Sequence, residues 1–251
     1  MFDIINNSST RIKTGAALVV ALLIIGWIDS MSLTWLLLGG VMLLALYEAM
    51  ELLKVDDNSI YIYAIIIWLV AYFYPSPQDL VFVIGVIYAS ILAYTKNFDI
   101  KRFLPLFYPI VSFLFLLSLY ISYGMEVLLW LLVVVAGVDV GGYFVGKTIG
   151  KTPFCETSPN KTLEGVAGGI IAATILGLIF SPDYGFFTVL VISVIVALAS
   201  VFGDLFESYL KREANVKDSG DILPGHGGVL DRVDGYLFGG IIMFVLLKLF
   251  V

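Results

Sequence analysis

Long apolar stretches are the feature that most constrains the fold of this chain. About nine of them follow one another, and each approaches the roughly 17–25 residues that cross the hydrocarbon core of a bilayer. They run near 15–28, 32–53, 60–74, 80–94, 103–123, 127–145, 166–180, 186–202 and 236–251. Charged residues make up only 14% of the 251 residues, against about 25% in soluble domains. Backbone polar groups inside a bilayer must be satisfied within the segment, so these stretches predict an all-α, polytopic membrane protein.

The distribution of basic residues predicts how these helices are oriented. Thirteen of the 14 lysines and arginines fall on alternate loops, and Lys248 is the exception. The positive-inside rule then predicts a cytosolic N-terminus and an external C-terminus. We expect the chain to lie in the cell (inner or plasma) membrane. It also puts the two long polar loops, 147–164 and 209–233, in the cytosol. We expect a membrane platform over residues 1–125 and a catalytic membrane domain over 126–251. The net charge of −6 gives no indication of a nucleic-acid partner.

Carboxylates gather around the second polar loop. Asp204 and Glu207 are three residues apart near the end of one predicted helix, and Asp231 and Asp234 repeat that spacing at the start of the next. Residues three apart share a helix face, so two carboxylate pairs would meet from two helix ends. Converging carboxylates repel one another unless cations neutralise them, and their hard oxygens favour Mg²⁺, Mn²⁺ or Ca²⁺. The alternative is a solvated loop in which the acids pair with nearby lysines and arginines.

Glycines between the two carboxylate pairs suggest a phosphate site. The run Pro224–Gly228 allows a ligand to approach the backbone closely, and backbone N–H groups together with Lys and Arg can bind phosphate. His226, the only histidine, lies within this run. It is either structural or a phosphate contact or acid–base group.

A second constellation surrounds Asp139, which lies well inside a predicted helix. A carboxylate there is expected to face a polar cavity. Glycines four apart follow it, a spacing that favours tight helix packing over ligand binding. Residues 141–148 match the phosphate-loop pattern G-x-x-x-x-G-K-[ST], but they continue an apolar helix without the strand that such a loop requires. In the loop beyond, Ser158, Lys161 and Thr162 are candidate phosphate ligands, and Glu164 is a candidate helix cap.

Several of these segments, taken together, resemble one family. The stretch from Ser208 through Pro224–Gly228 to Asp234 is similar to the signature of phosphatidate cytidylyltransferase, also called CDP-diacylglycerol synthase. The segments 203–208 and 158–165, and Asp139 followed by Tyr143 and Gly146, resemble other blocks of that family. The first five predicted helices resemble it only in hydropathy.

The resemblance implies the transfer of CMP from CTP to phosphatidic acid, with release of pyrophosphate, for phospholipid synthesis. It implies a homodimer with the active site at cytosolic helix ends, and a Mg²⁺-dependent site with a second cation such as K⁺. The implied metal ligands are Asp204 and Asp231, with Glu207 and Asp234 nearby, and Lys217 and His226 join the two aspartates as catalytic candidates. Further candidates for binding substrate phosphates are Ser158, Lys161, Thr162, Lys211, Arg212, Asp218, Gly227, Gly228 and Arg232.

Two other kinds of function remain open at this point. A CTP-dependent lipid-alcohol kinase would share the membrane site and the nucleotide. A transporter would explain Asp139 and the small residues inside a helix bundle. A transporter would not require the dense carboxylate, lysine and glycine pattern that follows Ser208.

Overall fold

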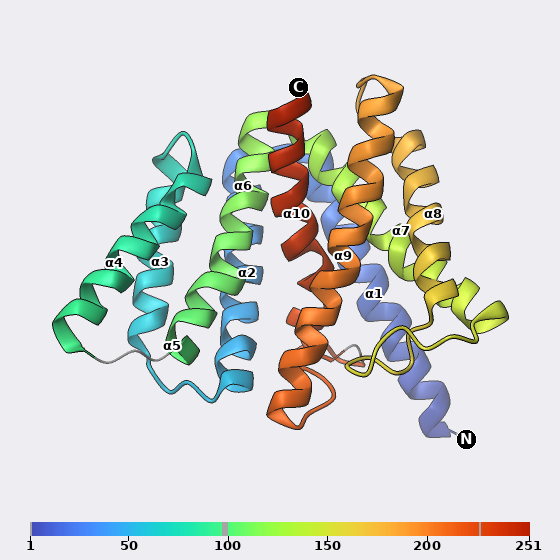
Figure 1. The fold of residues 1–251 in the computed structure, drawn as a ribbon, viewed down its shortest axis with the longest axis horizontal. Coiled ribbons are helices and arrows are strands. Elements are labelled where there is room, and N and C mark those ends of the chain that lie inside the picture. Colours follow the sequence, from blue (N-terminus) through green and yellow to red (C-terminus); the bar gives the residue numbers. More distant parts are fainter. Residues whose placement is uncertain (1, 97–99, 226) are drawn as a thin grey trace. The chain divides into compact units, whose positions relative to one another are not determined.

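The structure, a computed structural model, is built of helices throughout the residues it describes, which are 2–96, 100–225 and 227–251. Pairing of extended backbone within these ranges is limited to two isolated bridges, Pro153 with Thr162 and Leu223 with Gly227. Figure 1 shows the helices in chain order. They are α1 (Phe2–Ile28), α2 (Met31–Leu53), α3 (Ser59–Phe73), α4 (Leu80–Thr95), α5 (Ile100–Pro105), α6 (Ser112–Tyr123), α7 (Met125–Ile149), α8 (Leu163–Phe180), α9 (Phe186–Ala214) and α10 (Leu230–Phe250).

The helices confirm an all-α membrane protein. Seven described segments are long and apolar enough to cross a membrane, and two shorter apolar helices, Lys13–Ile28 and Ser59–Phe73, fall on the first and third predicted spans. Phe82 and Leu249 are each 73% exposed on the protein surface. Many other large apolar side chains are exposed as well, which is expected for a protein surrounded by hydrocarbon.

One span changes its helical geometry where two prolines occur. Pro105 ends α5, and Pro109 lies inside a π-helical segment, η2 (Leu106–Val111), which leads directly into α6. Proline lacks the N–H group that an α-helix would use, so the wider turn accommodates the missing hydrogen bonds.

The chain forms two compact units. The first contains residues 1–113 and 214–232, and the second contains residues 114–213 and 233–251. The polar segment 214–232 therefore belongs with the N-terminal helices. The functional division near residue 125 stays a prediction.

A pair of tryptophans joins α2 to α3 in the first unit. The indole N–H of Trp35 donates to the carbonyl of Trp68 at 3.0 Å, and that of Trp68 donates to the carbonyl of Trp35 at 3.2 Å. The rings stack with centroids 6.3 Å apart. Each indole N–H thus has a partner, as aromatic side chains with a polar group usually do where water is excluded.

Glycines bring α7 and α8 into backbone contact in the second unit, where the two helices lie side by side (Figure 1). A Cβ atom on Gly169 would lie 2.6 Å from the Val138 carbonyl oxygen, and one on Gly137 would lie 2.9 Å from the Cα of Ala173. Such distances leave no space for a side chain. The prediction that the spaced glycines pack helices is confirmed.

The phosphate-loop pattern at residues 141–148 lies entirely inside α7. The Thr148 hydroxyl donates to the Phe144 carbonyl of the same helix at 2.8 Å. This segment is therefore a membrane helix, as the lack of a strand before it predicts.

Candidate active site

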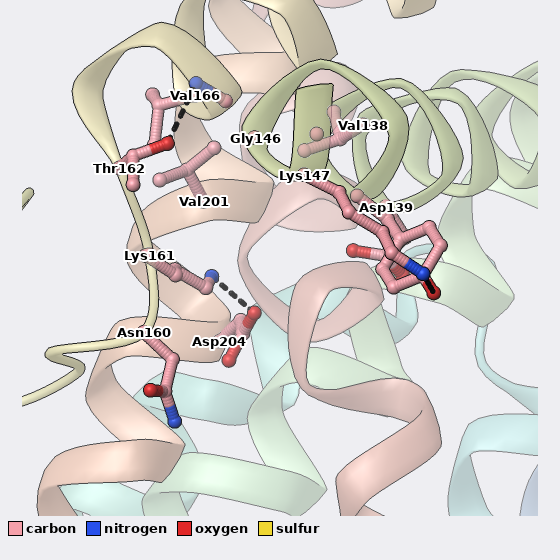
Figure 2. Close-up of a pocket in the computed structure, with 13 residues that line it drawn as sticks. Val138, Asp139, Gly146, Lys147, Asn160, Lys161, Thr162, Val166, Val201 and Asp204 are labelled. Carbon is pink, nitrogen blue, oxygen red and sulfur yellow. Dashed lines mark hydrogen bonds and ion pairs between the residues drawn. The ribbon is translucent and has the colours of Figure 1, made fainter. Parts of the chain in front are cut away.

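A cavity of about 540 Å³ lies within the second unit and brings charged groups together from three segments. Helix α7 supplies Asp139 and Lys147, the loop before α8 supplies Lys161, and α9 supplies Asp204. Figure 2 shows Lys161 and Asp204 pointing toward one another. The other lining residues are Val138, Gly142, Tyr143, Gly146, Asn160, Thr162, Gly165, Val166 and Val201.

An ion pair between Lys161 and Asp204 is the central contact of this cavity (Figure 2). Both side chains are partly exposed, at 27% and 29%. The second carboxylate oxygen of Asp204 accepts a long hydrogen bond, 3.4 Å, from the hydroxyl of Ser208 one turn further along α9. A lysine ammonium therefore already neutralises the carboxylate that the sequence marks as a cation ligand.

The loop that carries Lys161 is held by its own backbone. The Phe154 N–H donates to the Lys161 carbonyl at 2.8 Å. The Lys161 N–H in turn donates to the carbonyl of Ser158 at 3.0 Å, so the backbone of Ser158 supports the loop. Lys161 thus enters the cavity from a fixed backbone, which reduces the entropy lost when the side chain binds a ligand.

Helix α8 starts differently from the expectation for Glu164. Thr162 is the N-cap residue, and its side-chain oxygen accepts from the Gly165 N–H at 3.1 Å. Glu164 accepts instead from the N–H groups of Lys151 and Thr152, both at 3.1 Å, and from the Thr152 hydroxyl at 2.8 Å. The prediction of Glu164 as the N-cap is wrong, because Thr162 takes the extended position before the helix and its side chain accepts from the Gly165 N–H.

Three aspartates of the second unit share one region. Asp234 of α10 is close enough to Asp204 and Asp139 to interact with both electrostatically. Gly203 permits this approach, because a Cβ atom there would lie 2.5 Å from the Asp234 carbonyl oxygen. Carboxylates gathered in this way favour cations, and the Lys161 ammonium on Asp204 is one of them.

Glu207 and Lys211 form a second ion pair on α9, and Lys211 also interacts electrostatically with Asp234. Glu207 is fully buried and forms an ion pair with Lys211 one turn further along α9. Lys211, a predicted phosphate ligand, is thus engaged by a carboxylate, and its side chain is 11% exposed.

The glycine-rich loop of the first unit is organised by two acids. Asp231 accepts from the N–H of Ser219 at 3.0 Å and from the N–H of Gly228 at 2.8 Å through one carboxylate oxygen. Glu48 of α2 accepts from the Val229 N–H at 2.8 Å and the Leu230 N–H at 2.7 Å. The predicted metal ligand Asp231 therefore also has a local structural role.

Glycine is required within this loop by its backbone conformation. Gly225 and Gly227 have φ values of 78° and 80°, which disfavour any residue with a Cβ atom. The side chains of four predicted ligands, Arg212, Lys217, Asp218 and Arg232, are exposed. His226 lies outside the described residues.

These features fit one group of known proteins. The profile of the cytidylyltransferase family matches residues 9–250. The chain belongs to the cytidylyltransferase family. It is 44% identical over 242 residues to the phosphatidate cytidylyltransferase of Helicobacter pylori (strain J99), covering 95% of this chain and 91% of that protein. The family resemblance is confirmed.

Relatives from other bacteria carry the same name. The Thermotoga maritima phosphatidate cytidylyltransferase is 31% identical over 261 residues, 96% of each chain. That of Bacillus subtilis (strain 168) is 46% identical over 134 residues, about half of each chain. The family match covers all but the first eight residues and the last residue of this cytidylyltransferase, so the Asp204 cavity and the Glu48 contacts are both part of the family region.

The structure brings together only some of the predicted site residues. Asp139, Lys161, Thr162 and Asp204 line one cavity, and Asp234 lies near Asp204. Asp231 belongs to the other compact unit, so its approach to Asp204 stays a prediction.

Sequence reasoning missed Glu48 and the place of Lys147 in the cavity. The signal for Glu48 was present but shared, because Glu48 and Glu51 are both ionisable residues of one predicted span, where such residues are costly, and only the structure shows which of them is buried.

Proposed function

We propose that this cytidylyltransferase transfers CMP from CTP to phosphatidic acid, producing CDP-diacylglycerol and pyrophosphate. The observation that carries this proposal is the family match across residues 9–250, with relatives named phosphatidate cytidylyltransferase over 95% of the chain. The cavity supports it, since lysines and carboxylates in one site suit phosphates and the cations that accompany them.

The reaction requires positioning more than a nucleophile from the protein. An oxygen of the lipid phosphate attacks the α-phosphorus of CTP, a P–O bond forms there, and the bond to the β-phosphate oxygen breaks as pyrophosphate leaves. Lys161 and Lys147 are the described cations of the cavity, and they are suited to neutralise charge on the phosphates. The lipid chains stay in the bilayer, which explains a site at helix ends.

We also propose Mg²⁺ as the cofactor, with a second cation such as K⁺. Within the described part of the chain, no three His, Cys, Asp or Glu side chains are grouped closely enough to hold a metal ion by themselves. Mg²⁺ commonly uses one or two carboxylates and completes its shell with substrate phosphates and water. Asp204 and Asp234 fit that donor set. The Lys161 ammonium bound to Asp204 shows that this carboxylate already attracts a positive charge. Bound there, Mg²⁺ would offset the charge of the phosphates.

The remaining proposals concern the arrangement in the cell. We propose that the chain lies in the bilayer with its N-terminus and active site in the cytosol, on the basis of its basic residues, and that it forms a homodimer, as the family resemblance implies. With Cys155 replaced by serine, single cysteines at Pro77 and Asn215 should react from opposite sides of the membrane. Labelling of both from the same side would contradict the orientation.

Product analysis tests the activity. Purified protein in detergent micelles should convert CTP and phosphatidic acid to CDP-diacylglycerol and an equal amount of pyrophosphate, and excess EDTA should stop the reaction. A long-chain lipid alcohol in place of phosphatidic acid should give no product. A phosphorylated alcohol together with CDP would identify a lipid-alcohol kinase instead.

A further inference from the structure

Glu48 is a buried acid that the proposed reaction does not use. It lies near the C-terminal end of α2 and is 1% exposed. One carboxylate oxygen accepts from the Val229 N–H, and the other accepts from the Leu230 N–H and from the Ser219 hydroxyl at 2.8 Å. Three donors from one loop satisfy a group that accepts but does not donate.

Ser219 connects Glu48 directly to Asp231. Its hydroxyl donates to Glu48 and accepts from the Asp231 N–H at 3.3 Å, while its N–H donates to the Asp231 carboxylate. Glu48 thus binds both ends of the loop, at residue 219 and at residues 229–230.

The loop is shaped to receive this carboxylate. A Cβ atom on Gly220 would lie 2.7 Å from Glu48 Oε1, and a Cβ atom on Gly228 would overlap the other oxygen. Because two glycines pack closely around this carboxylate, the loop forms a specific binding site for the Glu48 side chain.

We propose that Glu48 is a positioning residue for nucleotidyl transfer. It fixes Ser219, Val229 and Leu230, and through Ser219 it orients Asp231, the predicted ligand of the cation that accompanies the CTP phosphates. This inference rests on the proposed function. Helix α2 thus has a part in placing Asp231, a predicted metal ligand that belongs to the same compact unit.

The substitution Glu48→Gln is the informative variant. A glutamine has one acceptor oxygen, so its NH₂ group must face either the Val229 N–H or the Leu230 N–H, and one donor loses its partner. We expect kcat per folded molecule to fall about 10–100-fold, the range for partners that orient active-site ligands. We also expect the KM for CTP to rise. Glu51→Gln, one turn away on the exposed part of α2, is the matched control and should behave like the wild type.

Hydrogen–deuterium exchange gives a second readout that needs no activity. Peptides that cover residues 217–231 should exchange faster in Glu48→Gln than in Glu51→Gln, while α2 itself keeps its protection. If Glu48→Gln fails to fold, Ser219→Ala removes one of the three donors and is judged by the same criteria. The double variant should lose little more than Glu48→Gln alone, since both changes break one network.

Three results would overturn the inference. One is kinetics and exchange in Glu48→Gln equal to those of Glu51→Gln. Another is a lower maximal rate with unchanged KM and exchange, which indicates only less folded protein. The third applies where Glu48→Gln does not fold: Ser219→Ala then shows the kinetics and the exchange of the wild type. Failure of the wild type to make CDP-lipid would instead refute the proposed function, and the exchange data would still decide whether Glu48 fixes the loop.

Discussion

Removing the charge of Lys161 should disable the enzyme while leaving it folded. The substitution Lys161→Met keeps most of the side-chain length and deletes the ammonium that pairs with Asp204. Asp204 then remains close to Asp234 without that counter-charge. Cations bound from solution or with CTP would have to compensate.

The expected magnitudes separate a catalytic effect from a loss of stability. Both partners are more than a quarter exposed, so breaking the pair should cost about 1 kcal/mol of folding stability, near the upper end for exposed ion pairs. With a total stability of about 5–15 kcal/mol, nearly all molecules stay folded. Loss of one preorganised charge contact to the transition state reduces kcat by about 10²–10³.

The assay compares Lys161→Met with Lys151→Met, which alters an exposed lysine of the same loop whose backbone N–H, not its side chain, binds Glu164. CDP-lipid formation is measured per folded protein, and thermal unfolding is followed in the same detergent. Lys151→Met should keep its turnover. The reasoning would be refuted by Lys161→Met turnover within about threefold of the control, or by an activity loss that only follows loss of folded protein.

Two further predictions concern the carboxylates and the helix packing. Asp204→Asn and Asp231→Asn should each lower turnover by about 10² or more, and their effects should not add, because the family resemblance implies that both carboxylates hold one metal site. Glu213→Gln should cost little, and three mild, similar effects would support a solvated loop. Gly169→Leu should lower the unfolding temperature, because overpacking of a tight contact costs about 1–3 kcal/mol. Gly85→Leu, where nothing lies within 4 Å of the added Cβ, should not lower it, and equal unfolding temperatures for the two would contradict the packing of α7 on α8.

The spans and the helix packing were predictable because each depends on local sequence. Apolar runs locate helices wherever hydrocarbon is the solvent, and glycines four apart mark where α7 and α8 meet. The family was predictable from the order and spacing of polar residues between Asp139 and Asp234.

Contacts between distant segments were not predictable from a single sequence. The partner of Asp204 is Lys161, 43 residues earlier, and Glu48 binds residues about 170–180 positions later. Spacing within one helix cannot reveal such partners. The start of α8 shows the same limit at short range, because Thr162 and Glu164 are both plausible caps until the backbone decides which one reaches the free N–H groups.

The most direct test of the account follows the phosphorus atoms of CTP. Two reactions are run with phosphatidic acid, one with CTP labelled at the α-phosphate and one with CTP labelled at the γ-phosphate. The account predicts that the α label enters the lipid and the γ label leaves in pyrophosphate, in equal amounts, and that Asp204→Asn suppresses both. Transfer of the γ label to the lipid, with CDP as the other product, would contradict nucleotidyl transfer.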